Sequence, residues 1–189
     1  HDDIDATIVC EVENGVPFVY TACEVDRQGD SGMCHIAKLN GLNGEVAWTV
    51  QVPCTRHNIN NKHFDGGMYS TPLLGGGNCS DLIFSTLAND GVNGDGHFYA
   101  FEKRTGKVVY KTKLKHYAWS SPVGFYNEKN ELFIVVGDTY GYLYLIEGKT
   151  GRIIYDERFG ANFESSPVVV GNTLVVGSRG QSVYKVHIE

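Results

Sequence analysis

Apolar and polar residues alternate in short runs along this chain, and the runs recur in a fixed order. Segments ending in Ser-Thr-Pro or Ser-Ser-Pro occur at residues 69–72, 119–122 and 164–167, which places their prolines 50 and then 45 residues apart (122 − 72 and 167 − 122). Each segment is followed by an apolar, β-branched run, a glycine turn and an alternating run rich in aromatic residues. Such runs predict half-buried strands, and no stretch has the 3.6-residue apolar period of a confident helix.

The repeating unit contains four predicted strands. Its third strand ends at a tight turn, Arg-Thr-Gly-Lys at 104–107 or Lys-Thr-Gly-Arg at 149–152, and a fourth strand follows. The amino-terminal part of the chain ends in the same way, at a glycine turn followed by a strand through Trp48. Four antiparallel strands that recur every ~40 to 50 residues predict an all-β fold, a β-propeller with about four blades. We predict one domain whose units span roughly residues 1–54, 55–116, 117–162 and 163–189, the last without its fourth strand.

The motifs also resemble a known family. The run Ser-Ser-Pro-Val-Val-Val-Gly-Asn-Thr-Leu-Val-Val-Gly-Ser at 165–178, with Lys-Thr-Gly-Arg-Ile-Ile-Tyr at 149–155, is similar to the quinoprotein-type (pyrroloquinoline quinone-like) propeller repeat. The resemblance covers most of the chain from Tyr69 onward. In that family the outer strand of a blade usually carries a docking tryptophan, which Trp48 matches and which Tyr110 and Tyr155 replace.

Rings of this family usually have seven or eight blades, so the resemblance implies half of an eight-bladed ring, with a small four-bladed ring as the alternative. An open half-ring exposes strand edges and the apolar flanks of its terminal blades, which natural proteins cover. We therefore expect self-association as a homodimer, or a complementary half-propeller chain. Residues 1–4 of the same or another chain are candidates for the missing fourth strand.

The composition of the chain argues against some classes of function. The chain of 189 residues has 16 Lys and Arg against 22 Asp and Glu, a net charge of −6, which argues against a nucleic-acid partner. No apolar run is long enough to cross a bilayer. With 23 glycines and two methionines, neither at position 1, the sequence indicates a turn-rich domain whose original amino terminus was removed.

Five cysteines lie within the first 79 residues, without the paired Cys-x-x-Cys spacing of a zinc site. We predict disulfides between Cys23 and Cys34 across a hairpin and between Cys54 and Cys79, which leaves Cys10 unpaired. These bonds imply a secreted or extracytoplasmic protein, and the Asn-Cys-Ser triplet at 78–80 adds an acceptor for N-glycosylation, as in a glycoprotein. Five reduced, buried thiols are the alternative.

Two polar segments offer oxygen or nitrogen ligands. His57, His63 and Asp65, in the loop after Cys54, are candidate ligands for a divalent transition metal, although their spacing matches no recognised motif. The turn at 89–96, which includes Asn93, is rich in the oxygens that suit calcium but lacks the spacing of a calcium loop. A solvated connecting loop and an ordinary β-turn are the favoured interpretations, and no cofactor is expected.

The residues that begin the innermost strands of propeller blades lie near the mouth of the central channel. In this chain they form three pairs, with Asp5 as a looser equivalent in the first unit. Aromatic rings beside carboxylates and hydroxyls form a surface that stacks on sugars, although the same rings also pack between blades. The candidate ligand-binding residues are Tyr69, Ser70, Trp119, Ser120, Glu164 and Ser165.

These observations favour a non-enzymatic, extracytoplasmic binding or scaffold protein that self-associates and binds a protein or glycan partner. Lectin-like binding of carbohydrate at the channel mouth is one alternative. A quinone-dependent oxidoreductase is another, and in that class the resemblance implies a calcium or lanthanide ion, an aspartate base and, in many members, a disulfide between adjacent cysteines. No adjacent cysteine pair occurs here, and no serine has an identifiable catalytic histidine and acid.

Overall fold

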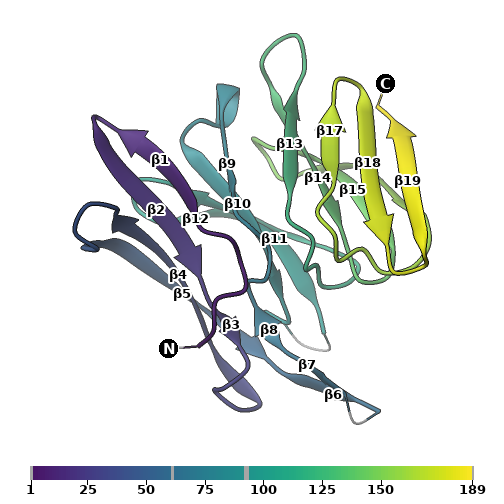
Figure 1. Cartoon of the computed structure of the whole chain (residues 1–189), viewed down its shortest axis with the longest axis horizontal. Coiled ribbons are helices and arrows are strands. Elements are labelled where there is room, and N and C mark those ends of the chain that lie inside the picture. Colours follow the sequence, from purple (N-terminus) through teal and green to yellow (C-terminus); the bar gives the residue numbers. More distant parts are fainter. Residues whose placement is uncertain (1, 61, 92–93, 189) are drawn as a thin grey trace.

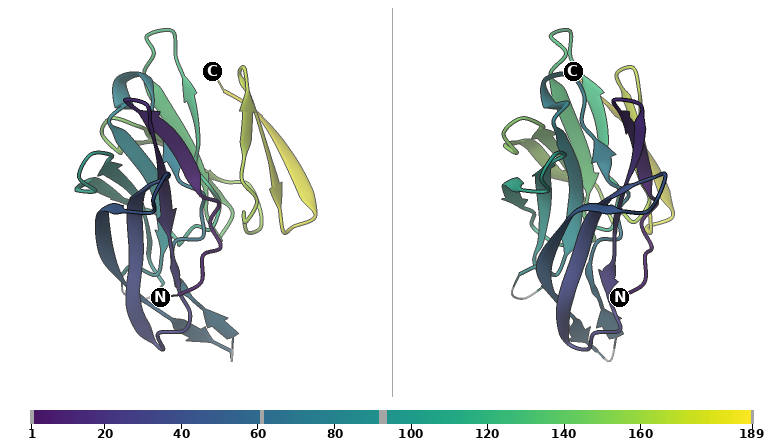
Figure 2. Two further views of the ribbon diagram at one scale, coloured as in Figure 1. Left: turned by 60° about the vertical axis from the view of Figure 1, so that its left-hand side comes forward. Right: turned by 90° about the vertical axis from the view of Figure 1, so that its left-hand side faces the viewer.

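The computed structural model describes residues 2–60, 62–91 and 94–188, and it consists of antiparallel β-sheets that follow one another along the chain. Figure 1 shows the sheets side by side in an arc, from the amino-terminal sheet at the left to the carboxy-terminal sheet at the right. The left view of Figure 2 shows the same sheets turned by 60°, with the last sheet at one end of the arc. The predicted all-β propeller fold is confirmed.

The first sheet, which we call blade 1, has four strands in the order β1-β2-β4-β5. Its turns use residues with positive φ, Asn14 and Gly15 between the first two strands and Gly44 between the last two. Glycine and asparagine reach this region at the lowest steric cost, so the chain can reverse direction tightly there. The strands are β1 (Val9–Glu13), β2 (Val16–Ala22), β4 (Ser31–Asn40) and β5 (Val46–Thr55).

The second sheet, blade 2, borrows a strand from the first predicted unit. Its order is β12-β11-β10-β8-β3, with β9 paired to β10. Glu24 of β3 lies opposite Gly67 of β8, where a Cβ atom on the glycine would lie 2.6 Å from the Cα atom of Glu24. The absence of a side chain therefore permits this pairing. The strands are β3 (Glu24–Val25), β8 (Gly66–Gly67), β9 (Leu73–Leu74), β10 (Leu82–Ala88), β11 (Gly96–Glu102) and β12 (Val108–Lys113).

Blades 3 and 4 follow in simple meander order, β13-β14-β15-β16 and β17-β18-β19. A two-stranded hairpin of β6 (His57–Ile59) and β7 (Lys62–Phe64) and a short 3-10 turn, η1 (Gly77–Cys79), complete the described elements. Within the described ranges no helix is long and apolar enough to span a membrane. The strands are β13 (Val123–Tyr126), β14 (Leu132–Gly137), β15 (Tyr142–Glu147), β16 (Ile153–Arg158), β17 (Val168–Val170), β18 (Thr173–Ser178) and β19 (Ser182–His187).

The hydrophobic core is divided among the blade junctions. One cluster joins blades 1 and 2 and includes Tyr20, Trp48 and Phe101. A second joins blades 2 and 3 around Phe84 and Tyr144, and a third, smaller cluster joins blades 3 and 4. Each sheet therefore buries its apolar face against the next one, which is how a sheet stacked in a propeller excludes water.

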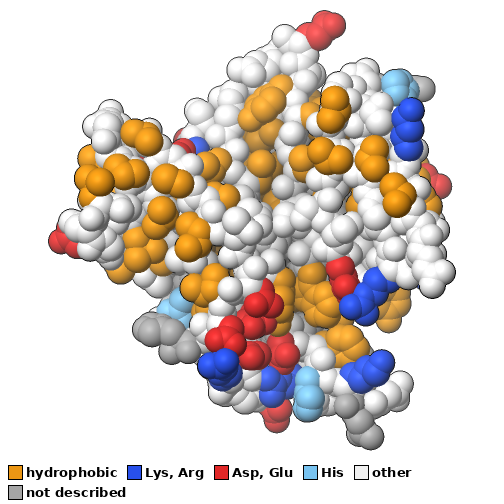
Figure 3. All heavy atoms as spheres, in the orientation of Figure 1, with side chains coloured by type: hydrophobic (Ala, Val, Ile, Leu, Met, Phe, Trp, Pro, Cys, Tyr) orange, Lys and Arg blue, Asp and Glu red, His pale blue; other side chains and the backbone are white. Residues whose placement is uncertain are grey.

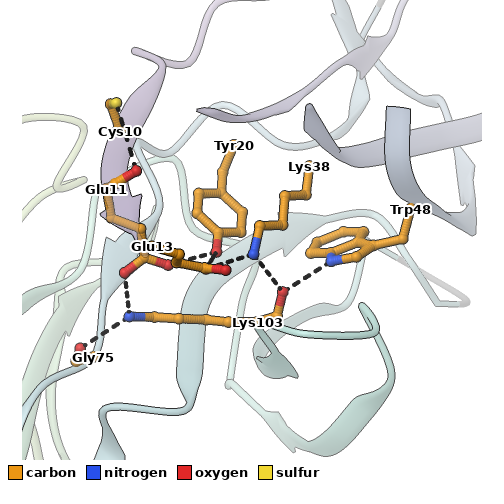
Figure 4. A network of polar contacts seen from close by, with 8 residues as sticks. All are labelled: Cys10, Glu11, Glu13, Tyr20, Lys38, Trp48, Gly75 and Lys103. Carbon is orange, nitrogen blue, oxygen red and sulfur yellow. Dashed lines mark hydrogen bonds and ion pairs between the residues drawn. The ribbon is translucent and has the colours of Figure 1, made fainter. Parts of the chain in front are cut away.

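A charged network closes the first junction (Figure 4). The buried Lys38 ammonium contacts Glu13 at 2.5 Å and the Lys103 backbone oxygen at 3.3 Å, and Lys103 Nζ contacts Glu11 at 2.7 Å. The Tyr20 hydroxyl donates to Glu11 at 2.6 Å. Burial raises the pKa of Glu11, but the hydrogen bonds from Lys103 and Tyr20 outweigh it and leave that pKa below its ordinary value. Both buried ammonium groups thus have carboxylate partners, as buried charges require.

The predicted disulfides are wrong for this structure, because all five cysteines, each in the described part of the chain, are free. The Cys23 amide donates to the His35 oxygen, so Cys23 lies opposite His35 and one position out of register with Cys34. Cys54 and Cys79 belong to different core clusters, at the first and second junctions. The alternative of buried thiols therefore holds for Cys23, Cys34, Cys54 and Cys79, while Cys10 is exposed.

Candidate binding site at the channel mouth

Four aromatic rings form a row across the starts of blades 2 and 3. The ring centroids of Tyr69 and Trp119 are 5.4 Å apart, and Trp119 lies 5.3 Å from Tyr117, which in turn lies 6.3 Å from Phe64. Each of these residues is partly exposed. Trp119 Nε1 is buried and has no hydrogen-bond partner among the described residues. The structure thus brings together the two aromatic residues that the sequence placed at the mouth, and it adds Tyr117 and Phe64.

Two of the predicted ligand contacts, Ser70 and Ser120, are fully buried, so the prediction that they face a ligand is wrong. The Ser70 hydroxyl bonds to Ser85 Oγ at 2.8 Å and accepts the Thr86 amide at 3.2 Å. The Ser120 hydroxyl donates to the Ser165 backbone oxygen at 3.0 Å, which joins blade 3 to blade 4. The repeated serines therefore satisfy buried backbone groups, because an unpaired polar group there would be costly.

Glu164 and Ser165 remain at the surface on the blade 4 side. The Glu164 carboxylate accepts hydrogen bonds from Asn162 Nδ2 at 2.8 Å and from Arg179 Nε at 2.7 Å. Ser165 is exposed, and its hydroxyl donates to the Gly177 oxygen at 2.7 Å. Of the six predicted mouth residues, Tyr69, Trp119, Glu164 and Ser165 are at least partly accessible to a ligand.

A group of carboxylates adjoins Tyr69, and most of its members were not predicted from the sequence. Asp3, Glu24 and Asp26 have carboxylate oxygens within 4.8 Å of one another. Figure 3 shows acidic side chains gathered below the centre of this face, near β3 and beside hydrophobic side chains. The acidic residues at 2–5 and 23–26 are the feature of the sequence that could have indicated this group. However, only the pairing of β3 with β8 places β3 in blade 2, the blade to which Tyr69 belongs.

The electrostatics of this group follow from burial and like charge. Burial, and the nearby Asp5, Asp26 and Asp3 carboxylates, raise the pKa of Glu24, while a hydrogen bond from Tyr69 opposes them. The hydrogen bond shared with Asp2 raises the pKa of Asp26. Burial opposes ionisation of Asp2 too, but hydrogen bonds from Asp26, Gln28 and Arg27 outweigh it and lower its pKa to about 2. This side of the mouth is therefore electronegative.

The predicted metal ligands His57, His63 and Asp65 do not form a cluster among the described residues. His57 Nε2 accepts the Gly94 amide at 2.8 Å, which occupies one of the two ring nitrogens that could bind a metal. His63 lies on the paired strand opposite Asn58, and Asp65 forms an ion pair with Arg56. The hairpin is thus fixed by contacts within the protein.

The oxygen-rich turn after β10 has protein partners as well. Asn89 Nδ2 donates to the Phe64 and Asp65 oxygens at 2.9 and 3.1 Å. The Asp90 carboxylate contacts His97 at 2.7 Å and Tyr99 at 2.5 Å. Asn93, which belongs to the same turn, lies outside the described residues.

A match to a protein-family model shows the family of this chain. Residues 93–189, just over half of the chain, match the family model of outer membrane protein assembly factor BamB. The chain belongs to the BamB family of pyrroloquinoline quinone-like propeller repeats. This confirms the resemblance found in the motifs. No curated protein matches this BamB-family sequence.

Solved structures agree on the fold. BamB from Moraxella catarrhalis is 15% identical with a TM-score of 0.64, and the match covers 99% of this chain and 47% of that one. The computationally designed Ika4 protein is 12% identical, with a TM-score of 0.61 and coverage of 100% and 93%. A europium-containing methanol dehydrogenase is also 12% identical, with a TM-score of 0.57 and coverage of 95% and 38%. This BamB-family chain therefore spans about half the length of BamB from Moraxella catarrhalis, which it matches with a TM-score of 0.64.

Proposed function

We propose that this chain is a non-enzymatic, extracytoplasmic binding scaffold that self-associates through its terminal blades and binds a partner at the channel mouth. The observation that supports it best is that both ends of the arc carry exposed apolar side chains. On blade 4, Val170 and Val183 are 74% and 75% exposed, and on blade 1, Val12 and Val46 are 68% and 59% exposed. In Figure 3 hydrophobic side chains gather over both end blades.

The two flanks have the chemistry of blade faces that pack together elsewhere in the molecule. The blade 1 flank has a hollow of about 210 Å³ lined partly by Ile4, Ala37, Leu39 and Val46. The exposed valine side chains of blade 4 in a second copy are apolar like these four lining residues. Burying both surfaces gains about 25 cal/mol for each Å² of apolar area removed from water. Because this chain spans about half of a natural BamB chain, two copies supply about the length of one such propeller.

The native mass tests self-association. Light scattering is expected to give about twice 20.8 kDa, and Val183→Asp should return the mass to that of one chain. Val109→Asp, on an exposed position of β12 away from both flanks, is the matched control and should leave the dimer intact. A single-chain mass for the unaltered protein at every concentration would refute self-association.

Tyr69 and Trp119 favour a glycan, or a protein surface with similar hydrogen-bonding groups, as the partner at the mouth. A ring pair at 5.4 Å offers an apolar face, while Glu164 and Ser165 provide hydrogen-bonding groups. Binding to a glycan array should be lost in Trp119→Ala and kept in Tyr126→Ala, which removes an exposed ring from β13. Equal binding by both variants would exclude the aromatic pair as the site.

A further inference from the structure

Carboxylates lie beside two rings of the aromatic row at the channel mouth. Burial and a hydrogen bond to the Glu24 carboxylate raise the pKa of Tyr69, and the charges of Glu24 and Asp65 add to this effect. Burial likewise raises the pKa of Tyr117 to about 12, and the charge of Glu164 contributes. Figure 3 shows acidic side chains next to hydrophobic side chains on this face. Both rings therefore lie in a negative electrostatic environment, which attracts cations.

Glu24 differs from the other carboxylates of the mouth because it is buried without a basic partner. It is 7% exposed, and it forms no ion pair with any lysine, arginine or histidine in the described ranges. The carboxylate of Asp26 has an oxygen within 4.8 Å of one on Glu24, and its buried Oδ1 atom has no hydrogen-bond partner among the described residues. A buried charge is costly unless it is paired, so an added cation would stabilise both groups.

The carboxylates of this surface that do have a basic partner are paired with arginine. The ion pairs in the described part of the chain are Arg27 with Asp3, Arg56 with Asp65 and Arg179 with Glu164. A planar guanidinium donates two parallel hydrogen bonds to a carboxylate and also stacks on an aromatic face, which an ammonium group does not do. Glu24 and Asp26, beside the Tyr69 ring, offer both features to an arginine from another molecule.

The same carboxylates are less suited to a metal ion. Asp3 is the third member of the group, and Arg27 Nη2 contacts its Oδ2 atom at 2.6 Å. This contact leaves two carboxylates without a basic partner, whereas calcium takes about six to eight oxygen ligands. The adjacent ring pair, Tyr69 and Trp119 with planes tilted by 50°, adds an apolar face that suits an organic cation.

We propose that the channel mouth binds a basic segment of a partner protein, with an arginine side chain of that segment paired to Glu24 and Asp26 and lying against the Tyr69 ring. This inference rests on the function proposed above, in which the mouth is a binding site, and it names the partner as a positively charged polypeptide instead of a neutral glycan. Such charge complementarity determines which partners bind and makes association depend on salt.

A fluorescent peptide of alternating arginine and glycine residues tests the proposal on the unaltered protein. It should bind saturably in an anisotropy titration, and its affinity should fall by about tenfold when the salt concentration rises from about 0.05 M to about 0.5 M. The same peptide with citrulline in place of arginine has the shape and the hydrogen-bonding groups without the charge, and it should not bind. Absence of saturable binding, or equal binding of the two peptides, overturns the proposal.

Two matched variants locate the peptide on the protein. Glu24→Gln keeps an acceptor for the Tyr69 hydroxyl but removes the charge, and it should weaken binding by about tenfold. Glu128→Gln removes the same charge from an exposed turn and should leave the affinity unchanged. Circular dichroism checks that both variants fold, and the citrulline peptide decides the matter if Glu24→Gln does not. Equal affinity of the two folded variants contradicts the site.

Two further probes separate this inference from the function on which it rests. Saturable binding of calcium chloride in calorimetry, without binding of the arginine peptide, would overturn the proposal in favour of a metal site. Glycan binding that Trp119→Ala abolishes, again without binding of the peptide, would also overturn it but would leave the mouth as the binding site. If neither glycan nor peptide binds, the mouth site itself fails.

Discussion

Trp48 Nε1 and Lys38 Nζ both donate to one backbone oxygen, that of Lys103, at 2.9 and 3.3 Å. This oxygen belongs to the turn that follows β11, so the two side chains of blade 1 hold the start of the fourth strand of blade 2. A buried carbonyl group has two lone pairs, and both are satisfied here by a single neighbouring blade. The contact fixes how the first two blades sit against each other.

Trp48→Phe should therefore cost much less stability than Trp48→Ala. The phenylalanine variant loses one hydrogen bond to an oxygen that Lys38 still reaches, about 1 kcal/mol, whereas the alanine variant leaves a cavity and should lose about 3 to 5 kcal/mol. Urea denaturation measures both. Tyr155→Ala, which removes an exposed ring at the equivalent place on β16, is the control and should change the free energy of unfolding by less than about 0.5 kcal/mol. Similar losses for Phe and Ala would show that the indole N–H, rather than packing, dominates.

Gly106→Ala should destabilise the protein more than Gly44→Ala. Both glycines have nearly the same φ, +74° and +75°, so both variants incur the strain of a left-handed backbone, about 1 to 2 kcal/mol. A Cβ atom at position 106 would also lie 2.6 Å from Trp48, while nothing lies within 4 Å of one at position 44. The difference in unfolding midpoint between the variants thus measures ring packing at the junction. Equal midpoints would show that the turn does not pack tightly on Trp48.

The cysteines should titrate as five free thiols in denaturant without reductant. The melting temperature should not change on addition of a reductant, because no covalent bond is lost. A count below five thiols in freshly purified protein would show that a disulfide is present and would contradict this prediction.

Cys23 should make stability depend on pH in the neutral range. Its hydrogen bond with Cys34, together with the His35 amide at 3.2 Å, lowers its pKa from 9.0 to about 6 against the effect of burial. A pKa lowered by folding stabilises the protein fully above the unfolded value and loses that contribution as pH falls through the folded value. The stability difference between the unaltered protein and Cys23→Ser should therefore grow from pH 6 to pH 9. A constant difference would contradict a folded-state thiolate.

Glu11 should have the corresponding effect in acid. Its folded pKa lies below the ordinary 4.5, so its contribution is complete above about pH 4.5 and is lost as pH falls through the folded value. Glu11→Gln should flatten the acid side of the stability profile measured by urea midpoints between pH 7 and pH 3. Glu128→Gln, in an exposed turn, should leave the profile unchanged. An unchanged slope in Glu11→Gln would contradict the network in Figure 4.

The local features of the fold could be predicted from sequence. Strand periodicity and glycine turns are encoded by neighbours in the chain, and Gly106 and Gly151 have the positive φ that the Thr-Gly turns require. The three-stranded last blade followed from the same repeat. Tyr69 and Trp119 came together because the blades repeat in register.

The features that depend on pairing between distant segments could not be predicted in this way. A shift of one residue in strand register places Cys23 opposite His35 instead of Cys34, although the two thiols remain in hydrogen-bond contact. Likewise, the pairing of Glu24 with Gly67 moves β3 into blade 2, and only that contact brings the carboxylates to the mouth. The burial of Ser70 and Ser120 is set by backbone groups of β10 and blade 4, which the repeat does not reveal.

The three blade junctions differ chemically although the blades repeat. The first contains two buried lysines with glutamate partners, the second uses the Tyr110 and Thr112 hydroxyls on glycine oxygens, and the third is mainly apolar. A blade 3 packed on blade 1 by mistake would leave Glu11 without the Lys103 ammonium group, because Gly148 has the equivalent place in blade 3. Misassembled orders of near-identical repeats are thereby penalised, because a charge stranded in an apolar contact costs several kcal/mol, on the order of 3 to 5. The chemical differences between the junctions therefore favour packing of the blades in their sequence order.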